Sequence, residues 1–488
     1  MKDVWKWITG VLGVGVGVLA AWFSYQLITL GMVPNKILAM IVVIVVLLWL
    51  IALVLMLRVQ SVLSRVLGVV LALALALATG FGTYYLQVTN GALRSLTYGD
   101  QIRKISSVYV LNNHVIEKPE QLDGRTIGYV NPDAEGTKRV LDGLKAKGIE
   151  VVGKQYESSI QMVNDLKGQA IDGIVLDQSY LGTIEEMEGQ NRIREEIVPV
   201  FDVEYAIQKT DSSSGVNTAS EPFNVLISGI DTYGSIEDVS RSDVNLIASV
   251  NPQTHQILVI SIPRDFYVET ACDASAGCAQ GKMDKLTHTG LHGIETTERT
   301  LEKLFGIEIN YNVRVNFSSL VTIIDELGGV DVDNVDEFTS LHGNYHFAPG
   351  KVHLDGDMAL GFVRERYSFT EGDRERGRNQ MRVLTAIIDK ITSPAILSNY
   401  AGIMKSISKS FQTNMSTKEI AALVNAQLSS DAPWTIYNYS VNGTGGTDFA
   451  YELQNNAYVM YPNEMTISNA KADIDSIFHG ETPPYVNH

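Results

Sequence analysis

The chain has 488 residues and a formal net charge of −17 at pH 7. This length allows two or three domains with ample cores. The acidic balance argues against a nucleic-acid-binding protein, which would need a broad basic field. The apolar residues are distributed unevenly, because the first 90 residues are almost wholly apolar and the rest has a composition typical of a soluble protein.

Three apolar runs open the chain, at residues 7–30, 37–57 and 62–86. At about 1.5 Å per helical residue, each is long enough to cross a hydrocarbon core of roughly 30 Å. A cleaved secretory leader would give one shorter run, so it does not account for three. We therefore predict a three-helix membrane anchor in residues 1–90.

The basic residues around these runs indicate an orientation. Lys2 and Lys6 flank the first run, Arg58 and Arg65 bracket the turn between the second and third, and the other turn holds only Lys36. Basic residues near membrane spans favour the cytoplasmic side. We therefore predict a multi-pass cell-membrane protein with a cytoplasmic N-terminus, and the odd number of spans places all later domains outside the cell.

Strand and helix patterns alternate in residues 91–210, which predicts a small α/β accessory domain with a parallel or mixed sheet. The expected strands are 125–130, 149–156 and 170–178, and the expected helices are 135–147 and 159–167. The segment LDGRTIGYVNPDAEGT resembles the start of one lobe of the extracellular solute-binding fold. No second lobe is evident, so we favour a scaffold for the next domain over an independent ligand site. Residues 211–221 are rich in Ser, Thr and Gly and are predicted to be a linker.

Three strands are expected after the linker, at residues 222–231, 243–252 and 256–265. Charged residues stand at their ends, namely Asp231, Arg241, Asp243 and Arg264. If the first two strands are adjacent, Asp231 and Asp243 meet at one edge of the sheet. Two carboxylates there suit Mg²⁺, which usually takes one or two protein carboxylates and keeps part of its hydration. Each aspartate taken alone also fits a turn or a helix cap.

The chain has two cysteines, Cys272 and Cys278, in a loop of small residues. They are too few for a disulfide scaffold and have the wrong pattern for zinc. In an extracellular region they could close a local disulfide loop, and otherwise they are two free thiols. The sequence leaves both alternatives open.

Residues 359–382 contain six arginines although the chain is acidic. Two guanidinium groups about 6 Å apart repel by roughly 3 kcal/mol at an effective dielectric constant near 20. Four acidic residues in the same stretch could relieve this repulsion as a solvated surface of mixed charge. Guanidinium groups that converge from two elements would instead suit a pyrophosphate. The arginines are Arg364, Arg366, Arg374, Arg376, Arg378 and Arg382.

The spacing within this stretch favours the pyrophosphate site. If residues 362–367 are extended, Arg364 and Arg366 point the same way, because strand side chains repeat every two residues. If a helix follows Gly372, then Asp373, Arg376 and Gln380 lie on one face of it.

Seven motifs occur in order along residues 222–390: ISGIDT, RSDVNLIASVNP, ISIPRD, DKLTHTG, FSSLVTIIDELGGVDV, FVRERY and DRERGRNQ. Together they resemble the LytR–CpsA–Psr family of bacterial cell-wall attachment enzymes. The three-span anchor and the extra external domain look like the capsular-polysaccharide branch of that family.

The resemblance implies a Mg²⁺-dependent phosphotransferase. Such an enzyme moves a glycopolymer phosphate from a polyprenyl-pyrophosphate carrier to a hydroxyl of peptidoglycan. The likeness to the capsular branch implies that the glycopolymer is capsular polysaccharide. It also implies that residues 222–488 form an α/β sandwich with a central mixed sheet and a lipid pocket. The fold class is then three transmembrane helices followed by two extracellular α/β domains.

The family's site roles carry over to matching positions of this sequence. Asp231 and Asp243 match its metal-binding acids, and Asp373 matches a motif position whose role, orienting group or base, stays open. Arg374, Arg378 and Arg382 fall outside the pattern. The pyrophosphate-binding and catalytic set implied by the resemblance is Arg241, Arg264, Arg364, Arg366, Arg376 and Gln380.

Two other functions fit parts of the sequence. A membrane-anchored sensor without enzymatic activity is disfavoured, because the short cytoplasmic segments leave no signalling domain. A pyrophosphatase that releases the polymer to water would differ only in its acceptor, and the sequence does not show the acceptor site.

Overall fold

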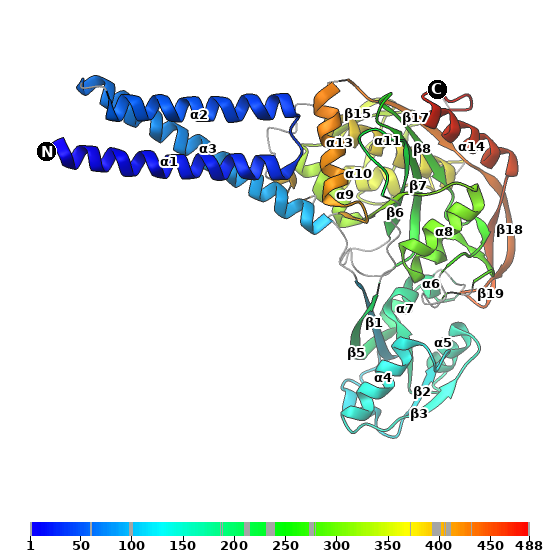
Figure 1. The fold of residues 1–488 in the computed structure, drawn as a ribbon. Coiled ribbons are helices and arrows are strands. Elements are labelled where there is room, and N and C mark those ends of the chain that lie inside the picture. Colours follow the sequence, from blue (N-terminus) through cyan, green and yellow to red (C-terminus); the bar gives the residue numbers. More distant parts are fainter. Residues whose placement is uncertain are drawn as a thin grey trace.

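The computed structural model describes residues 2–58, 61–96, 101–185, 187, 189–208, 215–230, 240–272, 278, 280–370, 372–392, 402–404, 406, 411–430 and 432–486. Three long helices form the N-terminal part: α1 (Lys2–Leu30), α2 (Asn35–Leu57) and α3 (Val62–Leu96). All three are long and apolar enough to cross a membrane. They pack side by side, and the N-terminus lies at the end farthest from the rest of the molecule (Figure 1).

Helix α3 continues ten residues beyond the predicted end of the third apolar run at residue 86. The extension stays helical because its apolar side packs on the rest of the protein. Leu93 and Leu96 join Leu27 and Leu30 of α1 in an apolar cluster. The cluster also takes in Ala421 of α13 (Thr417–Ser430), which lies between the anchor and the sheet behind it (Figure 1).

Phe411 extends this contact into the protein. It belongs to the apolar cluster just described and to a neighbouring one with Ile323 and Ile403. A hydrogen bond of 3.1 Å from Asn425 Nδ2 to the carbonyl oxygen of Gly31 adds a polar contact between α13 and the α1–α2 turn. We call this set of contacts the anchor junction.

The first sheet unit comprises residues 101–208 and has the strand order β3-β2-β4-β1-β5. Strand β2 is parallel to β3 and β4, whereas β1 is antiparallel to β4 and β5. The sheet is therefore mixed. Its strands are β1 (Gln101–Leu111), β2 (Thr126–Tyr129), β3 (Val152–Gln155), β4 (Gly173–Asp177) and β5 (Ile197–Gln208).

The three predicted strands and both predicted helices of this unit are present, the helices as α4 (Glu135–Ala146) and α5 (Ser159–Lys167). The long antiparallel pair β1 and β5 was not predicted. β5 is apolar at eight of its twelve positions and β1 at six of its eleven, so both sequences are compatible with strands. The sequence does not show that these two distant segments pair with each other.

The second sheet unit comprises residues 215–486 and is built on a six-stranded sheet of order β16-β11-β6-β7-β8-β17. Neighbours are antiparallel except for the parallel pairs β11/β6 and β17/β8. The predicted central mixed sheet is thus confirmed. Its strands are β6 (Phe223–Ile230), β7 (Ser242–Asn251), β8 (Gln256–Ile262), β11 (Tyr311–Asn316), β16 (Phe411–Thr413) and β17 (Thr435–Ser440).

Helices cover both faces of this sheet. On one face, Leu226 and Ile247 pack with residues of α8 (Ile294–Phe305) and α14 (Glu464–His479). On the other, Val225 and Leu246 pack with residues of α11 (Asp373–Thr392) and α13. Because successive strand residues point to opposite faces, both registers of β6, β7 and β8 are apolar. The unit is therefore a three-layer sandwich.

Helix α10 (Gly356–Arg364) corrects one prediction. The prediction that Arg364 and Arg366 point the same way required residues 362–367 to be extended, but 362–364 form the last turn of this helix. Its N-cap is Asp355, whose side chain accepts a hydrogen bond from the Met358 amide at 2.8 Å. The cap and the buried residues Ala359 and Phe362, three apart, favour a helix over a strand.

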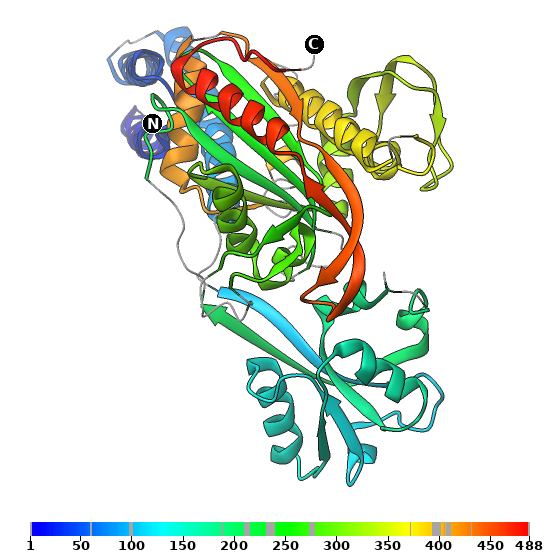
Figure 2. The ribbon, with the colours of Figure 1, turned by 90° about the vertical axis from the view of Figure 1, so that its right-hand side faces the viewer.

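Helix α11 confirms the predicted helix after Gly372. The remaining elements connect or extend the two sheets, and β18 and β19 form a long hairpin that reaches toward the first sheet unit (Figure 2). They are η1 (Pro119–Leu122), η2 (Gln178–Tyr180), α6 (Leu181–Glu185), α7 (Ile193–Glu196), β9 (Tyr267–Glu269), β10 (Met283–Lys285), η4 (Leu286–His292), α9 (Phe317–Glu326), β12 (Val330–Asn334), β13 (Phe338–Thr339), β14 (His346–Phe347), β15 (Gly350–Leu354), β18 (Gly443–Ala450) and β19 (Asn455–Pro462).

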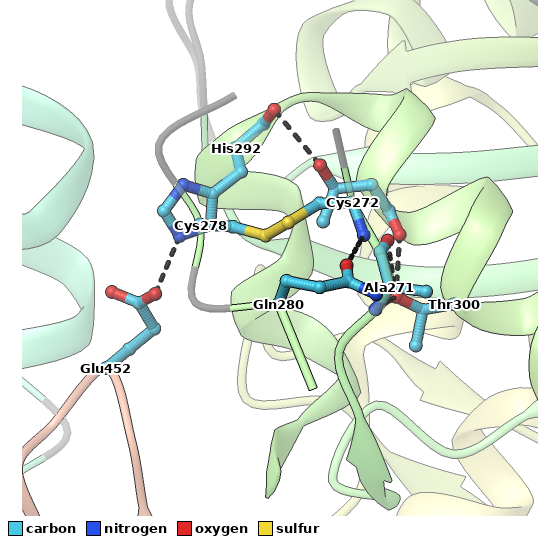
Figure 3. Close-up of a disulfide and its surroundings, with 8 residues drawn as sticks. Ala271, Cys272, Cys278, Gln280, His292, Thr300 and Glu452 are labelled. Atoms are coloured by element: carbon cyan, nitrogen blue, oxygen red, sulfur yellow. Dashed lines mark hydrogen bonds and ion pairs between the residues drawn. A yellow bond between two sulfur atoms is a disulfide. The ribbon is translucent and has the colours of Figure 1, made fainter. Parts of the chain in front are cut away.

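Cys272 and Cys278 are joined in a disulfide (Figure 3). This settles the alternative that the sequence left open. The surrounding loop is held by a hydrogen bond of 2.6 Å from the Cys272 amide to Gln280 Oε1. The Ala271 amide donates to the Thr300 hydroxyl at 3.0 Å, which ties the loop to α8.

Candidate functional site

A cavity of about 530 Å³ lies between the second sheet and helices α9, α10 and α11. Most of its wall is apolar, and charged residues gather among the remaining lining residues. Strands β6, β7 and β11 supply one side, and the helices supply the other. The apolar lining residues include Val225, Ile227, Val244, Leu246, Val313, Val315, Leu320, Ile323, Val363, Val383, Leu384, Ile387, Ile388, Ile391 and Phe411.

Five residues of the predicted pyrophosphate set line this cavity, together with one predicted metal ligand. They come from three separate parts of the chain, the start of β7, the end of β8 and the α10–α11 corner. They are Arg264, Arg364, Arg366, Arg376, Gln380 and Asp243.

Asp243 is the centre of the charged group. Arg264 Nη1 donates to its Oδ2 at 2.9 Å, and Thr287 Oγ1 donates to its Oδ1 at 2.7 Å. Arg241 Nη2 lies 3.8 Å from the same Oδ2 atom. Arg241 and Arg264 are both buried, so this carboxylate is held between two guanidinium groups away from bulk water.

These partners keep Asp243 ionised. Burial by itself would raise the pKa of the Asp243 carboxyl, but the charges of Arg264 and Arg241 and the Thr287 hydrogen bond outweigh it. The result is a pKa well below the ordinary value of an aspartate. Asp243 is therefore a permanent negative charge near neutral pH and a poor acceptor for a proton.

The close approach of η4 to the start of β7 brings Thr287 to Asp243. A Cβ atom added at Gly290 would lie 2.5 Å from the Ser242 amide nitrogen and 2.7 Å from the Ser240 carbonyl oxygen. Glycine is therefore needed at this position. Sequence reasoning did not assign a role to Thr287, although the motif DKLTHTG that contains both residues is the signal that could have found it.

A second close approach places α11. A Cβ atom at Gly377 would lie 2.5 Å from the Ser261 hydroxyl oxygen of β8. Glycine lets the first turns of α11 lie directly on the sheet. Arg376 and Gln380, which were predicted to share a helix face, both line the cavity.

Arg364 and Arg366 both line the cavity even though they do not belong to a strand. The Arg364 guanidinium stacks 4.4 Å from the centroid of the Phe317 ring. The Arg366 guanidinium lies 4.7 Å from the centroid of the Tyr367 ring and donates to the Tyr367 hydroxyl at 2.6 Å. Aromatic faces hold guanidinium groups in place while leaving donors for an anion.

The other three arginines of the stretch behave as the mixed-charge alternative describes. Arg378 and Arg382 pair with Glu375, the latter at 2.6 Å, and Arg374 Nη2 donates to the Gly443 carbonyl oxygen at 3.0 Å. Burial would raise the pKa of Glu375, but its hydrogen bonds and ion pairs with Arg382 and Arg378 lower it. The arginine stretch is thus divided between a cavity and an ion-pair network.

Two predicted site residues are not fully described. Asp231 lies outside the described residues, although Ile230, which precedes it, pairs with Ser242 next to Asp243. Asp373 is the first residue of α11, and its side chain lies outside what the structure describes. Strands β6 and β7 are adjacent, as the metal prediction required.

The described residues contain no group of three or more metal-ligating side chains. They do supply one suitable ligand for a hard cation, because Asp243 stays ionised next to the cavity. Mg²⁺ often takes only one or two carboxylates and completes its shell with water and phosphate oxygens. The donor set is therefore compatible with one Mg²⁺.

The charge of the cavity is unbalanced among its described lining residues. Four guanidinium groups face one carboxylate. At separations near 6 Å each guanidinium pair costs roughly 3 kcal/mol at an effective dielectric constant near 20, so the arrangement favours a multiply charged anion. Because the same cavity continues into an apolar wall, the ligand that fits it has an anionic head and a long apolar part.

The first sheet unit reaches this site. A Cβ atom added at Gly182 of α6 would lie 3.4 Å from Arg241 Nη2 and 3.5 Å from Arg194 Nη2. The backbone of α6 therefore lies against the guanidinium group that stands behind Asp243. One element of the first unit forms part of the support of the charged end.

Comparison with known proteins gives a consistent picture. A model of the LytR_cpsA_psr family matches residues 197–474. The chain is 37% identical to the polyisoprenyl-teichoic acid–peptidoglycan teichoic acid transferase TagU of Bacillus mycoides over 224 residues, 45% of this chain and 70% of that protein. It is 35% identical to TagU of Enterococcus faecalis, over 44% of this chain and 69% of that protein.

Among solved structures, TagV of B. subtilis is similar with a TM-score of 0.44 and 26% identity, covering 54% of this chain and 99% of that one.

Proposed function

Because the chain belongs to the LytR–CpsA–Psr family, we propose that it transfers a glycopolymer with its phosphate from a polyprenyl-pyrophosphate carrier to a hydroxyl of peptidoglycan. The relatives reported above are named as transferases of a polyisoprenyl-linked polymer to peptidoglycan. The observation that carries the proposal is the cavity with four arginines at a mostly apolar wall.

The shape and chemistry of the cavity support a lipid pyrophosphate as the donor. A prenyl chain would lie along the apolar residues of β6, β7, β11 and α11, where burial of each methylene contributes about 0.8 kcal/mol. The pyrophosphate would then meet Arg264, Arg364, Arg366 and Arg376. Charge-assisted hydrogen bonds of this kind contribute about 1.5–3 kcal/mol each.

The reaction is a phosphoryl transfer. A hydroxyl oxygen of peptidoglycan forms a bond to the phosphorus that carries the glycopolymer, and the bond from that phosphorus to the bridging oxygen breaks. The polyprenyl monophosphate leaves with the bridging oxygen, and the hydroxyl proton passes to a base. Catalysis of such a step consists mainly of positioning and charge stabilisation, which arginines can supply.

Asp243 does not fit the role of the base, because its pKa is held well below the ordinary range. We assign it to holding Arg264 in position and, with Asp231, to binding Mg²⁺. A bound Mg²⁺ would neutralise charge on the phosphate oxygens. Arg241 then stabilises the Asp243 carboxylate from behind, and Gln380, with a polar side chain at the cavity wall, orients the pyrophosphate.

We propose capsular polysaccharide as the polymer, because a three-helix anchor and a separate sheet unit precede the second sheet unit. We also propose that the N-terminus faces the cytoplasm and that both sheet units lie outside the cell as separate domains. In support, the start of α1, the end of α2 and the start of α3 lie at the end of the helices away from both sheet units (Figure 1).

The test uses the full chain purified in detergent, with a polyprenyl-pyrophosphate-linked polysaccharide and isolated peptidoglycan sacculi. The expected result is release of polyprenyl monophosphate and appearance of polymer in the insoluble peptidoglycan, both dependent on Mg²⁺. A parallel reaction with lipid-linked teichoic acid compares the two polymers. Release without sacculi at an equal rate would instead identify a pyrophosphatase, and binding without release would identify a sensor.

A further inference from the structure

A second cavity, of about 430 Å³, lies where the first sheet unit meets the β18–β19 connection. Its wall combines residues of both sheet units, and one of its residues, Cys278, belongs to the disulfide in Figure 3. We call it the interdomain cavity. Its polar wall includes Ser106, Thr137, Asp177, Tyr180, Glu452 and Gln454.

The interdomain cavity stands at the carboxyl ends of two parallel strands. Strand β2 ends at Tyr129 and β4 ends at Asp177, and the two are neighbours in the first sheet. The first turns of α4 and α5 line the same cavity through Thr137 and Ser159. Open α/β sheets place small-molecule ligands at this edge, where strand ends and helix starts converge.

One end of the interdomain cavity offers unused hydrogen-bond donors. The Thr137 side chain is only 8% exposed, and its hydroxyl has no hydrogen-bond partner in the part of the chain that the structure describes. The N-cap of α4 is Ala134, which gives no side-chain cap, whereas Ser158 caps α5. The first-turn amides of α4 therefore remain available, and together with the helix dipole they favour an anionic group.

The cavity also offers acceptors close to the first turn of α4, because a Cβ atom added at Gly136 would clash with the Ser106 hydroxyl. The hydroxyl groups of Ser106 and Tyr205 both donate to Oδ1 of Asp177, the latter at 3.4 Å. Its second carboxylate oxygen, Oδ2, accepts no hydrogen bond from the described residues. Glu157 adds a further, exposed carboxylate to the lining. These oxygens favour a cationic donor such as an ammonium group.

The carboxylates of Asp177 and Glu452 line this wall, and the ammonium group of Lys104 lies near both. Tyr180 donates to Glu452 Oε2 at 2.9 Å, and His292 Nε2 lies 2.6 Å from Glu452 Oε1, so both of these carboxylate oxygens are occupied by the protein. Figure 3 shows the His292–Glu452 contact beside the disulfide. Burial lowers the pKa of the Lys104 ammonium group, whereas the charges of Asp177 and Glu452 raise it.

We propose that the interdomain cavity binds a small zwitterion, an α-amino acid. Its carboxylate meets the α4 amides and the Thr137 hydroxyl, and its ammonium group meets Asp177. A volume of about 430 Å³ suits a ligand of this size. This site is separate from the arginine-lined cavity and does not depend on the transfer reaction.

The test measures binding to the full chain in detergent. The probes are the twenty standard L-amino acids with D-alanine and D-glutamate, each at 1 mM in a thermal-shift screen and then in titration calorimetry. A concentration of about 1 mM is used because it is on the order of the dissociation constant of a weakly bound ligand. The expected result is saturable binding of at least one zwitterion. Its matched analogues, the same molecule without the ammonium or without the carboxylate group, bind at least tenfold more weakly.

Two variants test where the ligand binds. Thr137→Val keeps the side-chain shape and removes the hydroxyl, and Asp177→Asn removes the charge, so each lowers the affinity at least tenfold. Asp142→Asn, on the exposed side of the same helix α4, is the control and leaves it unchanged. The proposal is overturned if no probe binds, if the ammonium-free analogue binds equally well, or if both site variants bind like the parent chain.

Discussion

The two cavities of this protein are opposite in chemistry. The arginine-lined cavity has an apolar wall and an excess of guanidinium groups, whereas the interdomain cavity is polar and has an excess of carboxylates. In the first, Asp243 is held by arginines, and in the second, Asp177 is held by hydroxyl groups. The comparison indicates that an aspartate can have two roles. In the first cavity it is part of an ion-pair scaffold, and in the second it is an open binding position.

The largest expected difference between the two cavities is in the free energy of unfolding that is lost when the aspartate of each is removed. We expect Asp243→Ala to lower the free energy of unfolding by about 3–5 kcal/mol, because two buried guanidinium groups, those of Arg241 and Arg264, lose the carboxylate that they share. Asp177→Ala should cost only about 1–2 kcal/mol, because its hydrogen bonds are to neutral hydroxyl groups and Lys104 keeps Glu452 as a nearby carboxylate. Denaturant unfolding of the two variants in detergent measures the difference, and equal losses would show that the two sites are not distinct in this way.

Arg366→Ala tests the charged end of the first cavity. Its guanidinium stacks on exposed Tyr367 at the surface, so the variant should fold, but transfer should fall about 10²–10³-fold because a charge-stabilising group is lost. Arg378→Ala is the matched control, because Glu375 keeps Arg382 as a partner. Rates of polyprenyl monophosphate release measure both, and parental turnover by Arg366→Ala would exclude a direct role.

Leu384→Gln tests the apolar wall. It places an amide among residues that line the cavity, and we expect the KM for a long-chain carrier to rise about tenfold, since roughly 1–3 kcal/mol of apolar burial is lost. Leu428→Gln, an exposed leucine of α13, should leave the KM unchanged. With a short-chain carrier, the rise in KM caused by Leu384→Gln should be smaller. An equal rise in KM with the long-chain and the short-chain carrier would contradict a lipid site.

The smallest effect concerns pH. The folded pKa of Asp243 lies below its unfolded value of about 3.9, so the unfolded state binds more protons as the pH falls through that range. Its contribution to stability is full above about pH 5 and is lost as the pH falls below 4 toward the folded pKa. Between pH 3 and 6, the free energy of unfolding measured with urea should therefore fall more steeply with decreasing pH for the parent chain than for Asp243→Asn. Identical pH profiles would show that the Asp243 carboxylate does not contribute to the acid sensitivity of the protein.

Much of the architecture follows from local patterns. The apolar runs of the anchor, the strands of the second sheet and the capping box of α13, where the Ser416 amide donates to Glu419 at 2.7 Å, are all encoded within a few residues. The pair β1 and β5 could not be predicted, because its residues become ordered through each other across almost the whole first sheet unit. Local propensity says little about such long-range pairing.

The site was predictable in its residue types but not in its geometry. The spacing of Arg376 and Gln380 indicated one helix face, and both line the cavity. Arg364 and Arg366 reach the cavity by a helix end rather than by a strand, because the Asp355 cap sets the local structure. The contact of α6 with Arg241 joins parts of the chain that no local pattern connects.

The anchor junction has a consequence for how a substrate arrives. Phe411 lines the arginine-lined cavity and also belongs to the apolar cluster at the ends of α1 and α3, so apolar side chains connect the anchor with the cavity wall. If the proposed polyprenyl carrier is the ligand, its tail could pass along these side chains without crossing water. In that case the anchor would do more than tether the protein, because it would also set how far from the bilayer the head group is bound.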